Sequence, residues 1–426
     1  MKWESISIEE IKLNSKNALV GGPFGSDLSG IHYVDFGVPV IRGTNLPFDS
    51  TFNNADFVFV SEEKANKLSA NTAFPGDLIF TQRGTLGQVG IVPCGEFDKY
   101  IISQSQMKLT VDITKANPLF VYYYFRTKEC LKRIENLAFS SGVPHINLGI
   151  LRKFKIPYPP ITIQNKIATL LSVYDDLIEN NKQRIKLLEE MAGEIYKEWF
   201  VRLRFPGYNT TKFFNREGEE VPKGTDGALP EGWEKVRINE VTNNYDSKRS
   251  PLSSMARMEI QGEFPYFGAA KIIDYINDYI FDGKYLLLAE DGSVISSNGN
   301  PVLQFVNEKF WVSNHAHVIE GKLPISTEYI YLALSKFSIL GLVTGAAQPK
   351  INQENLNRIE VLKPSEIFIN KFNEIIIPLF DEILILNKKN KLLQQTRDLL
   401  LPRLISGKLS VEHMVDQNPD MKAVAH

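Results

Sequence analysis

The 426-residue sequence lacks the features that mark several common protein classes. It has two cysteines, Cys94 and Cys130, which excludes a disulfide framework and favours a reducing compartment. No run of about 18 apolar residues is present, so we expect no membrane-spanning helix and no membrane partner. The first residues include acids and no apolar stretch of the kind that a secretory signal needs. These absences predict a soluble cytoplasmic protein.

Motifs for nucleotide binding, catalysis and metal binding are also missing. There is no phosphate-binding Gly-Lys-Ser/Thr loop, and no Gly-x-Gly-x-x-Gly opens a helix. Pro157-Tyr158-Pro159-Pro160 lacks the leading Asn or Asp that amino-methyltransferases need, so we interpret it as the entry to a helix. His315 and His317 would share one face of a strand, but no cysteine or acidic cluster completes a metal shell. The sequence therefore predicts no catalytic residues, no metal site and no cofactor on this chain.

The sequence has no excess of either charge sign. Its 48 Lys and Arg and 50 Asp and Glu give a formal net charge of −2, and the pI is about 6.4. A free-standing nucleic-acid-binding protein usually carries a basic face and a high pI. If the chain binds DNA, either its basic residues gather on one face or a partner supplies phosphate contacts.

What the sequence does contain is a repeat. The first copy is Ser141–Asn147 with Leu151, Ile156 and Pro159, and the second is Pro349–Asn352 with Leu356, Val361 and Pro364. The shift from Asn147 to Asn352 is 205 residues, which is too long for a solenoid unit. Each copy precedes a long helical pattern. The repeat therefore predicts two similar modules, each made of a globular part and a helix.

Residues 1–158 are predicted to form a mixed module with much β-sheet. A glycine-rich turn at Gly21–Ser26 precedes runs of β-forming residues that Gly, Pro, Asn and Asp separate. The predicted strands are Val38–Arg42, Asp56–Val60, Asp77–Thr81, Val89–Val92 and Met107–Val111. Residues 203–232, rich in Gly and Pro, are predicted to be a linker docked through Phe205, Phe213 and Phe214. The second globular module follows at residues 233–364.

Two long helices are predicted, at residues 159–202 and 365–412. Apolar residues recur along both at spacings of three and four, and roughly 38 residues at 1.5 Å rise give a rod of about 57 Å. Pro378 is expected to kink the second helix or mark its start. Both apolar seams turn polar near mid-length, and a buried polar residue in such a seam fixes the register. The predicted register residues are Asn181, Asn387 and Asn390.

The two helices are predicted to pack on each other, antiparallel, with their polar layers facing. The alternative is that each helix lies separately on its own module, but a helix this long would overhang a small domain. Residues 413–426 are predicted to form a disordered tail. The expected fold class is thus α+β, with two pseudo-repeated mixed α/β domains joined by two long antiparallel coiled-coil helices.

The chain resembles a known family. Glu198–Arg202 followed by Phe205-Pro206-Gly207 is similar to the central conserved region of type I restriction–modification specificity subunits. The other matching segments are Ser141–Asn147, Ile156-Pro157 with Pro159-Pro160, Gln164 with Ile167, Leu229-Pro230 with Gly232-Trp233, and Leu404–Leu409. These segments cover nearly the whole chain in the family's order, and together with the two-fold repeat they carry the resemblance.

The resemblance implies a non-catalytic subunit with two target-recognition domains, residues 1–158 and 233–364. Each would read one half of a split site in double-stranded DNA. The conserved helices would space the half-sites and dock two methyltransferase subunits, and restriction subunits would complete the complex. The partner subunits are expected to use S-adenosylmethionine, ATP and Mg²⁺, with no cofactor on this chain. Partners that enclose the DNA would also account for the near-neutral charge.

Candidate DNA contacts follow from the chemistry of base edges, because Arg pairs with guanine and Asn or Gln with adenine. The candidates in the first module are Arg42, Asn45, Gln82, Arg83, Gln88, Gln104, Ser105 and Gln106. Gly22 and Ser26 lie in the glycine-rich turn, which is either a nest for phosphate or a plain tight turn. His145 and Lys350, each one residue after a proline, are predicted to make an equivalent contact with phosphate.

The second module differs from the first at its candidate contacts. The candidates there are Lys248, Arg249 and Lys271 for phosphate, and Asn298, Asn300, Asn314, His315 and His317 for bases. Glu290-Asp291-Gly292 replaces Gln82-Arg83-Gly84, and such acids could accept hydrogen bonds from cytosine amino groups. Within the family this difference implies unlike half-sites.

Two functions of other classes stay open at this point. The chain is alternatively a scaffold whose helices hold two protein-binding modules together, or an enzyme that cuts DNA alone. Alanine at Arg83 and Lys350 would abolish site-specific DNA binding only in a specificity subunit, and incubation of the pure chain with DNA and magnesium would reveal a nuclease.

Overall fold

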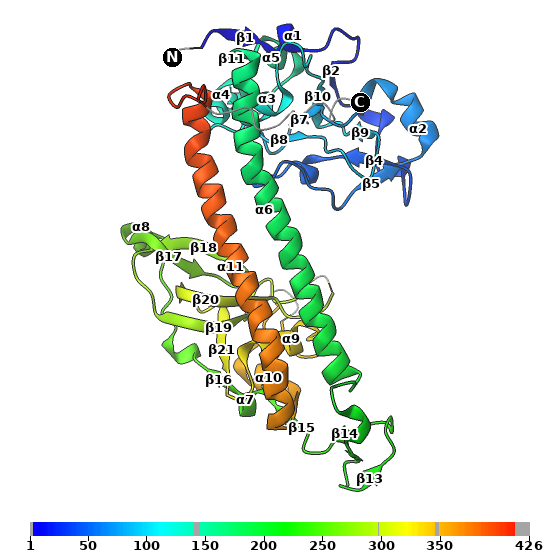
Figure 1. Cartoon of the computed structure of the whole chain (residues 1–426), viewed down its shortest axis with the longest axis vertical. Helices are drawn as coiled ribbons and strands as arrows, with labels where there is room; N and C mark the ends of the chain where they lie inside the picture. Colours follow the sequence, from blue (N-terminus) through cyan, green and yellow to red (C-terminus); the bar gives the residue numbers. More distant parts are fainter. Residues whose placement is uncertain (1–2, 140–144, 297, 346–348, 414–426) are drawn as a thin grey trace. The chain divides into compact units, whose positions relative to one another are not determined.

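The structure is a computed structural model that describes residues 3–139, 145–296, 298–345 and 349–413 (Figure 1). The chain divides into two compact units, Met1–Asn181 with Lys389–His426, and Lys182–Lys388. Each unit holds one α/β domain and a segment of each long helix, α6 (Ile161–Tyr196) and α11 (Glu366–Ile405). None of the described helices combines the length and apolarity that a membrane span requires.

The domain of the first unit contains two main sheets. Its strands are β1 (Ser5–Ser7), β2 (Leu19–Gly21), β3 (Tyr33–Val34), β4 (Val38–Ile41), β5 (Val58–Val60), β6 (Thr72–Ala73), β7 (Leu78–Thr81), β8 (Val89–Ile91), β9 (Tyr100–Ile102), β10 (Gln106–Leu109) and β11 (Lys155–Pro157). Its helices are α1 (Ile8–Ile11), α2 (Glu62–Lys67), α3 (Pro118–Phe125), α4 (Lys128–Phe139) and α5 (Leu148–Lys153). The sheet orders are β2-β10-β7-β8 and β3-β5-β4-β9-β6, and β1 pairs with β11. Each of the five predicted strands overlaps an observed one, so that prediction is confirmed.

The core of this domain forms between the four-stranded sheet and α3. Phe80 on β7 meets Phe125 on α3 with ring centroids 4.7 Å apart, and Met107 on β10 is fully buried beside them. Helix α3 is apolar on all sides because it is enclosed on all sides. The same core extends to Leu171 on α6 and Leu404 on α11, so the two helices are part of this unit's interior.

The domain of the second unit is built on one six-stranded sheet of order β16-β21-β19-β20-β17-β18. Its strands are β15 (Glu234–Arg237), β16 (Thr242–Asn244), β17 (Gln261–Phe267), β18 (Ile272–Ile276), β19 (Phe281–Ala289), β20 (Leu303–Val312), β21 (Ala316–Gly321) and β22 (Glu360–Lys363), and its helices are α7 (Ile238–Val241), α8 (Ser254–Glu259), α9 (Thr327–Ser335) and α10 (Gln353–Asn357). β15 pairs with β22, as β1 pairs with β11 in the first unit.

Apolar residues cover both faces of the six-stranded sheet. Leu286 and Leu288 on β19 pack in one cluster with Tyr329 of α9 and Phe372 of α11, whereas Leu287 packs in a separate cluster with Phe310 and others. Successive side chains of a strand point to opposite faces, so the alternation along β19 explains the two clusters. The helices thus cover one face of this sheet.

The linker is docked in the second unit, as predicted. It forms a small sheet of β12 (Phe213–Phe214), β13 (Glu220–Val221) and β14 (Leu229–Pro230). Phe205 and Phe213 are buried, and the ring of Phe205 lies 4.8 Å from that of Trp233. Phe214 is only half-buried.

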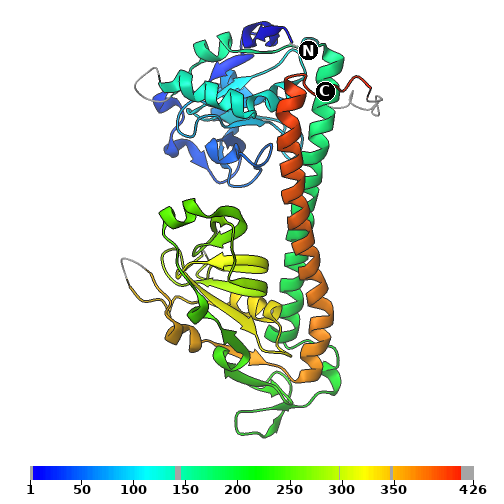
Figure 2. The same cartoon turned by 90° about the vertical axis from the view of Figure 1, so that its left-hand side faces the viewer.

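The two long helices run antiparallel in each unit (Figure 2). In the first unit Asn181 donates to Asn390 at 2.8 Å, and Asp175 pairs with Arg397, so positions rise along α6 as they fall along α11. In the second unit Arg184 pairs with Glu382 at 2.7 Å, and Phe200, just after α6, meets Phe372 at 4.7 Å. The alternative of two separately placed helices is excluded.

The structure places α11 one residue after the predicted boundary at residue 365, so Pro378 does not mark its start, and the prediction for Asn387 is wrong. The helix begins at Glu366, twelve residues before Pro378, because Ile369, Phe372 and Ile376 are fully buried and hold its first turns in place. The ring of Pro378 lies on the exposed side. Asn387 is also exposed, so Asn390 alone among the two predicted asparagines of α11 lies in the helix interface.

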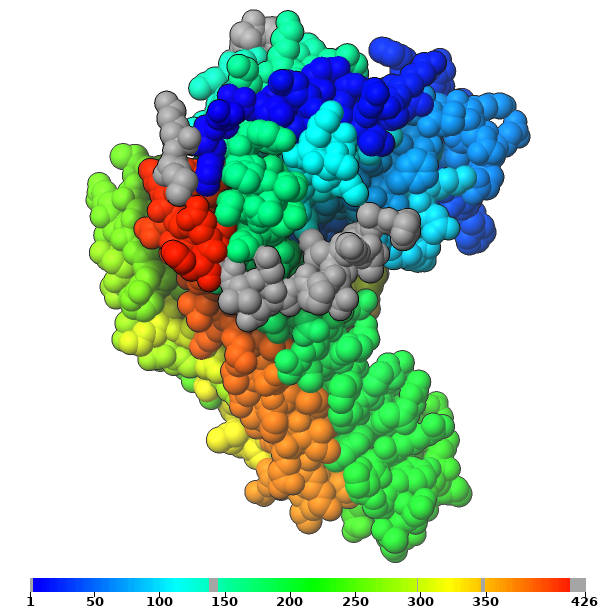
Figure 3. Space-filling model, turned by 45° about the horizontal axis from the view of Figure 1, so that its top comes forward, coloured from blue at the N-terminus to red at the C-terminus, as the bar shows by residue number. Residues whose placement is uncertain are grey.

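The N-terminal segment closes the first unit. Figure 3 shows it, in blue, beside the start of α6 in green and the end of α11 in red. The indole of Trp3 lies so close to Gly407 that a Cβ there would fall 2.8 Å from the ring, and Gly407 has a φ of +71°. Only glycine fits this contact without strain. The predicted tail from residue 414 onward lies outside the described residues.

Candidate nucleic-acid interface

A depression of about 660 Å³ in the first domain gathers most of its predicted DNA contacts. The loop after β4 brings Arg42, the loop between β7 and β8 brings Arg83 and Gln88, and the turn between β9 and β10 brings Gln104 and Ser105. These segments are far apart in the sequence, and the fold brings them together around one depression. The arrangement concentrates guanidinium, amide and hydroxyl groups, which are the groups that hydrogen-bond to base edges.

The side chains of this depression differ in how firmly they are held. Gln88 donates to the Gly43 carbonyl at 3.2 Å and accepts from Thr81 at 3.0 Å, and Arg42 donates to the Asp56 carbonyl at 2.6 Å. Gln104 is exposed but donates to the Gly25 carbonyl at 2.7 Å. Arg83 is exposed, and its guanidinium has no hydrogen-bond or ion-pair partner among the described residues. Arg83 is therefore the cation of this surface that is most available to a ligand.

Three predictions for the first domain need correction. Asn45 is fully buried, accepts from the Arg42 N–H and donates to the Asn53 and Ala55 carbonyls, so it shapes the loop and cannot reach a base. The N–H of Gly22 donates to the Gln106 carbonyl and is not free for phosphate. A Cβ at Gly22 would lie 1.9 Å from the Ser103 carbonyl oxygen, so glycine is needed there for close packing. Gln106 is itself buried.

The remaining candidates of the first domain lie around the depression. Ser26 is exposed, and Gln82 and His145 are half-buried. His145 forms a backbone bridge with Arg83, which places the two predicted contacts side by side. Residues 140–144, which begin the first copy of the repeat, lie outside the described residues.

Backbone hydrogen bonds establish which positions of the two domains correspond. In the first domain the Gln82 N–H donates to the Ser105 carbonyl at 2.7 Å, and the Gln82 carbonyl accepts from Ile146 at 3.2 Å. In the second domain Glu290 makes the same two bonds, with His315 and Ile351, at 2.8 Å each. The bridges Arg83–His145 and Asp291–Lys350 complete the match.

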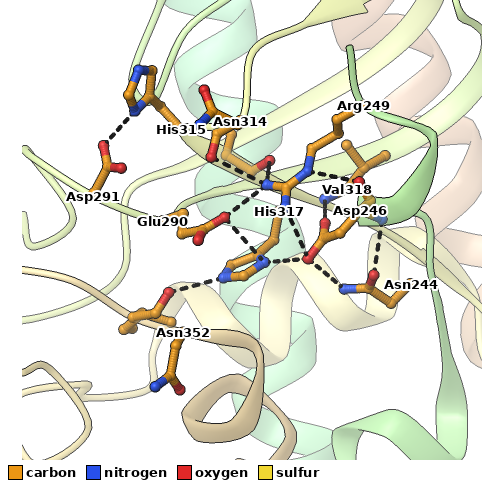
Figure 4. A network of polar contacts seen from close by, with 12 residues as sticks. Asn244, Asp246, Arg249, Glu290, Asp291, Asn314, His315, His317, Val318 and Asn352 are labelled. Carbon is orange, nitrogen blue, oxygen red and sulfur yellow. Dashed lines mark hydrogen bonds and ion pairs between the residues drawn. The ribbon is translucent and has the colours of Figure 1, made fainter. Parts of the chain in front are cut away.

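A buried network of charges lies below the second domain's loops (Figure 4). His317 places Nδ1 2.5 Å from Asp246 and Nε2 2.9 Å from the Ile351 carbonyl. The Ile351 carbonyl can only accept, so Nε2 donates to it, and Nδ1 lies against the carboxylate of Asp246. Arg249 donates to Glu290 at 2.7 Å, and Lys350 lies 3.1 Å from the other oxygen of Glu290. The network ties four chain segments together.

His317 affects the pKa of its acidic neighbour, Asp246. Burial raises the pKa of Asp246, but the hydrogen bond and charge of His317, with the N–H of Val318, outweigh burial and lower the pKa below its usual value. Asp246 therefore stays ionised inside the domain.

The sequence analysis missed the acidic partners of His317. Asp246, Glu290 and His317 bring ligand atoms within 4.8 Å of one another, which is a spacing that suits a metal ion. Arg249 and Lys350 already neutralise these carboxylates, so the geometry favours an ion-paired network over a divalent cation. The acids are remote in sequence, and the only signal for them was Glu290-Asp291 at the place of Gln82-Arg83.

Two contacts predicted for the second domain are wrong. The Arg249 guanidinium is 14% exposed, pairs with Glu290 and donates to the Ala316 carbonyl, so it is not available to bind phosphate. His317 is 1% exposed and cannot face a base. Asn300 is half-buried and donates to the Ser335 carbonyl. The candidates that are exposed are Lys248, Lys271, Asn298, Asn314, His315 and Lys350.

Two related α/β domains that present polar loops, together with long antiparallel helices, define a protein with two recognition modules. The family model described as "Type I restriction modification DNA specificity domain" matches residues 36–190 and 230–395, which is well over half of the chain. The chain belongs to this family of type I restriction–modification specificity subunits.

Individual relatives agree with this assignment. The chain is 27% identical over 387 residues to the type I restriction enzyme MjaIX specificity subunit of Methanocaldococcus jannaschii, covering 85% of each. It is 33% identical over 127 residues to a putative specificity subunit, S.HindORF215P, of Haemophilus influenzae, covering 30% of this chain and 32% of the relative. The crystal structure of a type I restriction–modification S subunit from M. genitalium has the same fold, with a TM-score of 0.58 and 18% identity over 95% of this chain and 96% of that one. These relatives are named specificity subunits and not catalytic subunits.

Proposed function

We propose that this chain is the DNA sequence-specificity subunit of a type I restriction–modification complex and recognises a bipartite site in double-stranded DNA. Each domain reads one half-site through the loops described above. The chain docks methyltransferase subunits and, through them, restriction subunits. It performs no catalysis itself, and S-adenosylmethionine, ATP and Mg²⁺ belong to its partners.

The observation that carries the proposal is the duplicated placement of polar loops. The same backbone hydrogen bonds position Arg83 in the first domain, beside the segment of the exposed Gln104, and Asp291 in the second, beside the segment of the exposed Asn314 and His315. Because the two sets of side chains differ, two unlike half-sites are the natural target. The net charge of −2 agrees with partners that share the phosphate contacts.

Docking of partners is supported by apolar side chains that the long helices expose. In the first unit Val173 and Leu177 on α6 are 48% and 47% exposed, and Leu392 and Leu399 on α11 are 62% and 66% exposed. Spacings of four and seven residues place each pair on one face of its helix. Exposed apolar stripes of this kind mark surfaces for other proteins.

The test is a genome-wide methylation map of a host that carries the methyltransferase, with and without this chain. Loss of methylation at one two-part motif when the chain is absent would support the proposal and reveal both half-sites. An unchanged map with the methyltransferase expressed would favour the scaffold alternative.

The docking surface has its own test. Leu392→Glu with Leu399→Glu should prevent co-purification of the methyltransferase, whereas Lys391→Glu, at an exposed polar position of the same helix, should not. Retention of the methyltransferase by the double variant would exclude this stripe as the docking surface.

A further inference from the structure

The second domain places an acid where the first domain places its available arginine. Since Glu290 and Gln82 make equivalent backbone hydrogen bonds, Asp291 corresponds to Arg83, and His315 corresponds to Ser105. The backbone is conserved between the domains at these positions, and the side chains have opposite hydrogen-bonding character. Arginine can only donate, and a carboxylate can only accept.

Asp291 and His315 form one polar pair at the surface. His315 Nδ1 lies 2.7 Å from Asp291 Oδ1, and because the carboxylate only accepts, Nδ1 carries the proton. The side chain of His315 is 51% exposed and that of Asp291 is 19% exposed. Figure 4 shows this pair to one side of the buried network, on the loops that the network connects.

The buried network holds both residues of the pair in place. Arg249 donates to the Asn314 carbonyl at 3.3 Å and the Ala316 carbonyl at 2.8 Å, which are the residues on either side of His315. Asp291 follows Glu290, whose carboxylate bonds Arg249, and its backbone pairs with Lys350. A side chain fixed by such a supporting layer contributes geometry as well as charge to recognition.

We propose that Asp291, oriented by His315, is a specificity-determining residue of the second domain and selects a base that presents its exocyclic amino group in the major groove, cytosine or adenine. Its carboxylate accepts from that amino group in the major groove and repels the O6 and N7 acceptors of guanine. At the corresponding position Arg83 would instead favour guanine. His315 is a positioning residue in this account. The inference rests on the proposed function.

The test uses the full chain assembled with its methyltransferase partner and duplexes of the mapped motif. In each duplex one amino group of the second half-site is removed, with purine in place of adenine or 2-pyrimidinone in place of cytosine. The wild-type complex should lose about 5- to 150-fold in affinity at the position that Asp291 reads. With Asp291→Ala, removal of the amino group at that position should have no further effect.

Two further variants separate recognition from folding. Asp282→Ala, at an exposed acid on β19, should behave as wild type on every duplex. His315→Ala keeps the carboxylate and should reduce the dependence on that one amino group, whereas a general folding defect would weaken all positions equally. If Asp291→Ala prevents assembly, the inference is tested by His315→Ala alone. An unchanged dependence of the affinity on that one amino group would then overturn the inference.

Different results would overturn this inference and the proposed function. A wild-type complex that prefers a two-part sequence, but whose amino-group dependence is untouched by Asp291→Ala at every position, excludes Asp291 as a reader. A wild-type complex with no preference for any two-part sequence overturns the proposed function itself.

Discussion

The two domains support equivalent loops in different ways. In the first domain Met107, fully buried and paired with Phe80 across the sheet, lies behind the loop of Arg83. In the second domain His317, paired in the same way with Leu288, occupies that place and carries a charge network. The same backbone arrangement is thus supported by an apolar side chain in one domain and by ion pairs in the other. The comparison shows that the charge carried by equivalent loops can be inverted while the backbone hydrogen bonds of the loops are kept.

The largest expected effect is the loss of stability caused by Arg249→Met in the second domain. This substitution leaves Asp246 and Glu290 buried without their guanidinium, and we expect a loss of about 3 kcal/mol in the free energy of unfolding, measured by denaturant titration. Arg83→Met, at the exposed position of the first domain, should cost less than about 0.5 kcal/mol.

The double variant Arg249→Met with Glu290→Gln sharpens this prediction. It removes a negative charge together with its partner, so it should recover part of the lost stability. Equal stability of Arg249→Met and wild type would show that the network does not hold the second domain together.

Arg83→Ala should reduce affinity for the specific site by about 1–3 kcal/mol and relax the base preference in one half-site only. The physical reason is the loss of a bidentate donor that no described residue engages. Fluorescence anisotropy of the assembled complex on duplexes with single base changes would measure this. A relaxed preference in both half-sites would contradict the division of labour between the domains.

Asp246 and Asp77, one buried carboxyl group in each domain, should affect stability in acid in opposite directions. The folded-state pKa of Asp246 is lowered, so its contribution to stability is present above about pH 4 and is lost as the pH falls through that lowered pKa. Burial raises the pKa of Asp77 in the first domain, although Lys108 opposes it, so stability there increases as the pH falls through the raised value.

Asp246→Asn tests this contrast. The variant should be about 1.5 kcal/mol less stable than wild type near neutral pH, and the difference should shrink in acid. Chemical denaturation between pH 3 and 7 is the measurement. A difference that stays constant across this range would mean that the ionised carboxylate is not what stabilises the second domain.

The smallest effect is expected from Lys271→Ala in the second domain. Lys271 is exposed, and a single phosphate contact should change the slope of log affinity against log salt by about 0.9 without altering sequence preference. A change in the mapped motif would show that Lys271 reads bases, and an unchanged slope would show that it does not contact phosphate.

Much of the fold was predictable because its signals are local or repeated. Five strands between Val38 and Leu109 are indicated by β-forming runs between turn residues, and the long helices by spacings of three and four. The short strands β6 and β9 were not predicted. The pattern placed the second long helix from residue 365, and α11 begins at Glu366, although Pro378 left a later start open. Propensity at Pro378 favours a break, and only the burial of Phe372 and Ile376 before it shows why the helix continues.

The candidate site residues likewise divide into those that the sequence selected correctly and those that only the tertiary contacts could decide. Residue type and repeat position were enough to select Arg83, Gln104 and His315, which the structure leaves exposed. They wrongly selected Asn45, Arg249 and His317, whose side chains bond to other groups inside the protein. The partner of His317 lies 71 residues away, at Asp246. No local pattern can report such a pairing.

The sequence by itself determined that this protein has two related modules, long helices and membership of the specificity-subunit family, because repeats, periodicity and conserved segments are properties of the linear chain. The tertiary structure decided which polar side chains face outward and which neutralise one another. Burial and ion pairing depend on distances between segments that are remote in sequence, and only folding sets these distances.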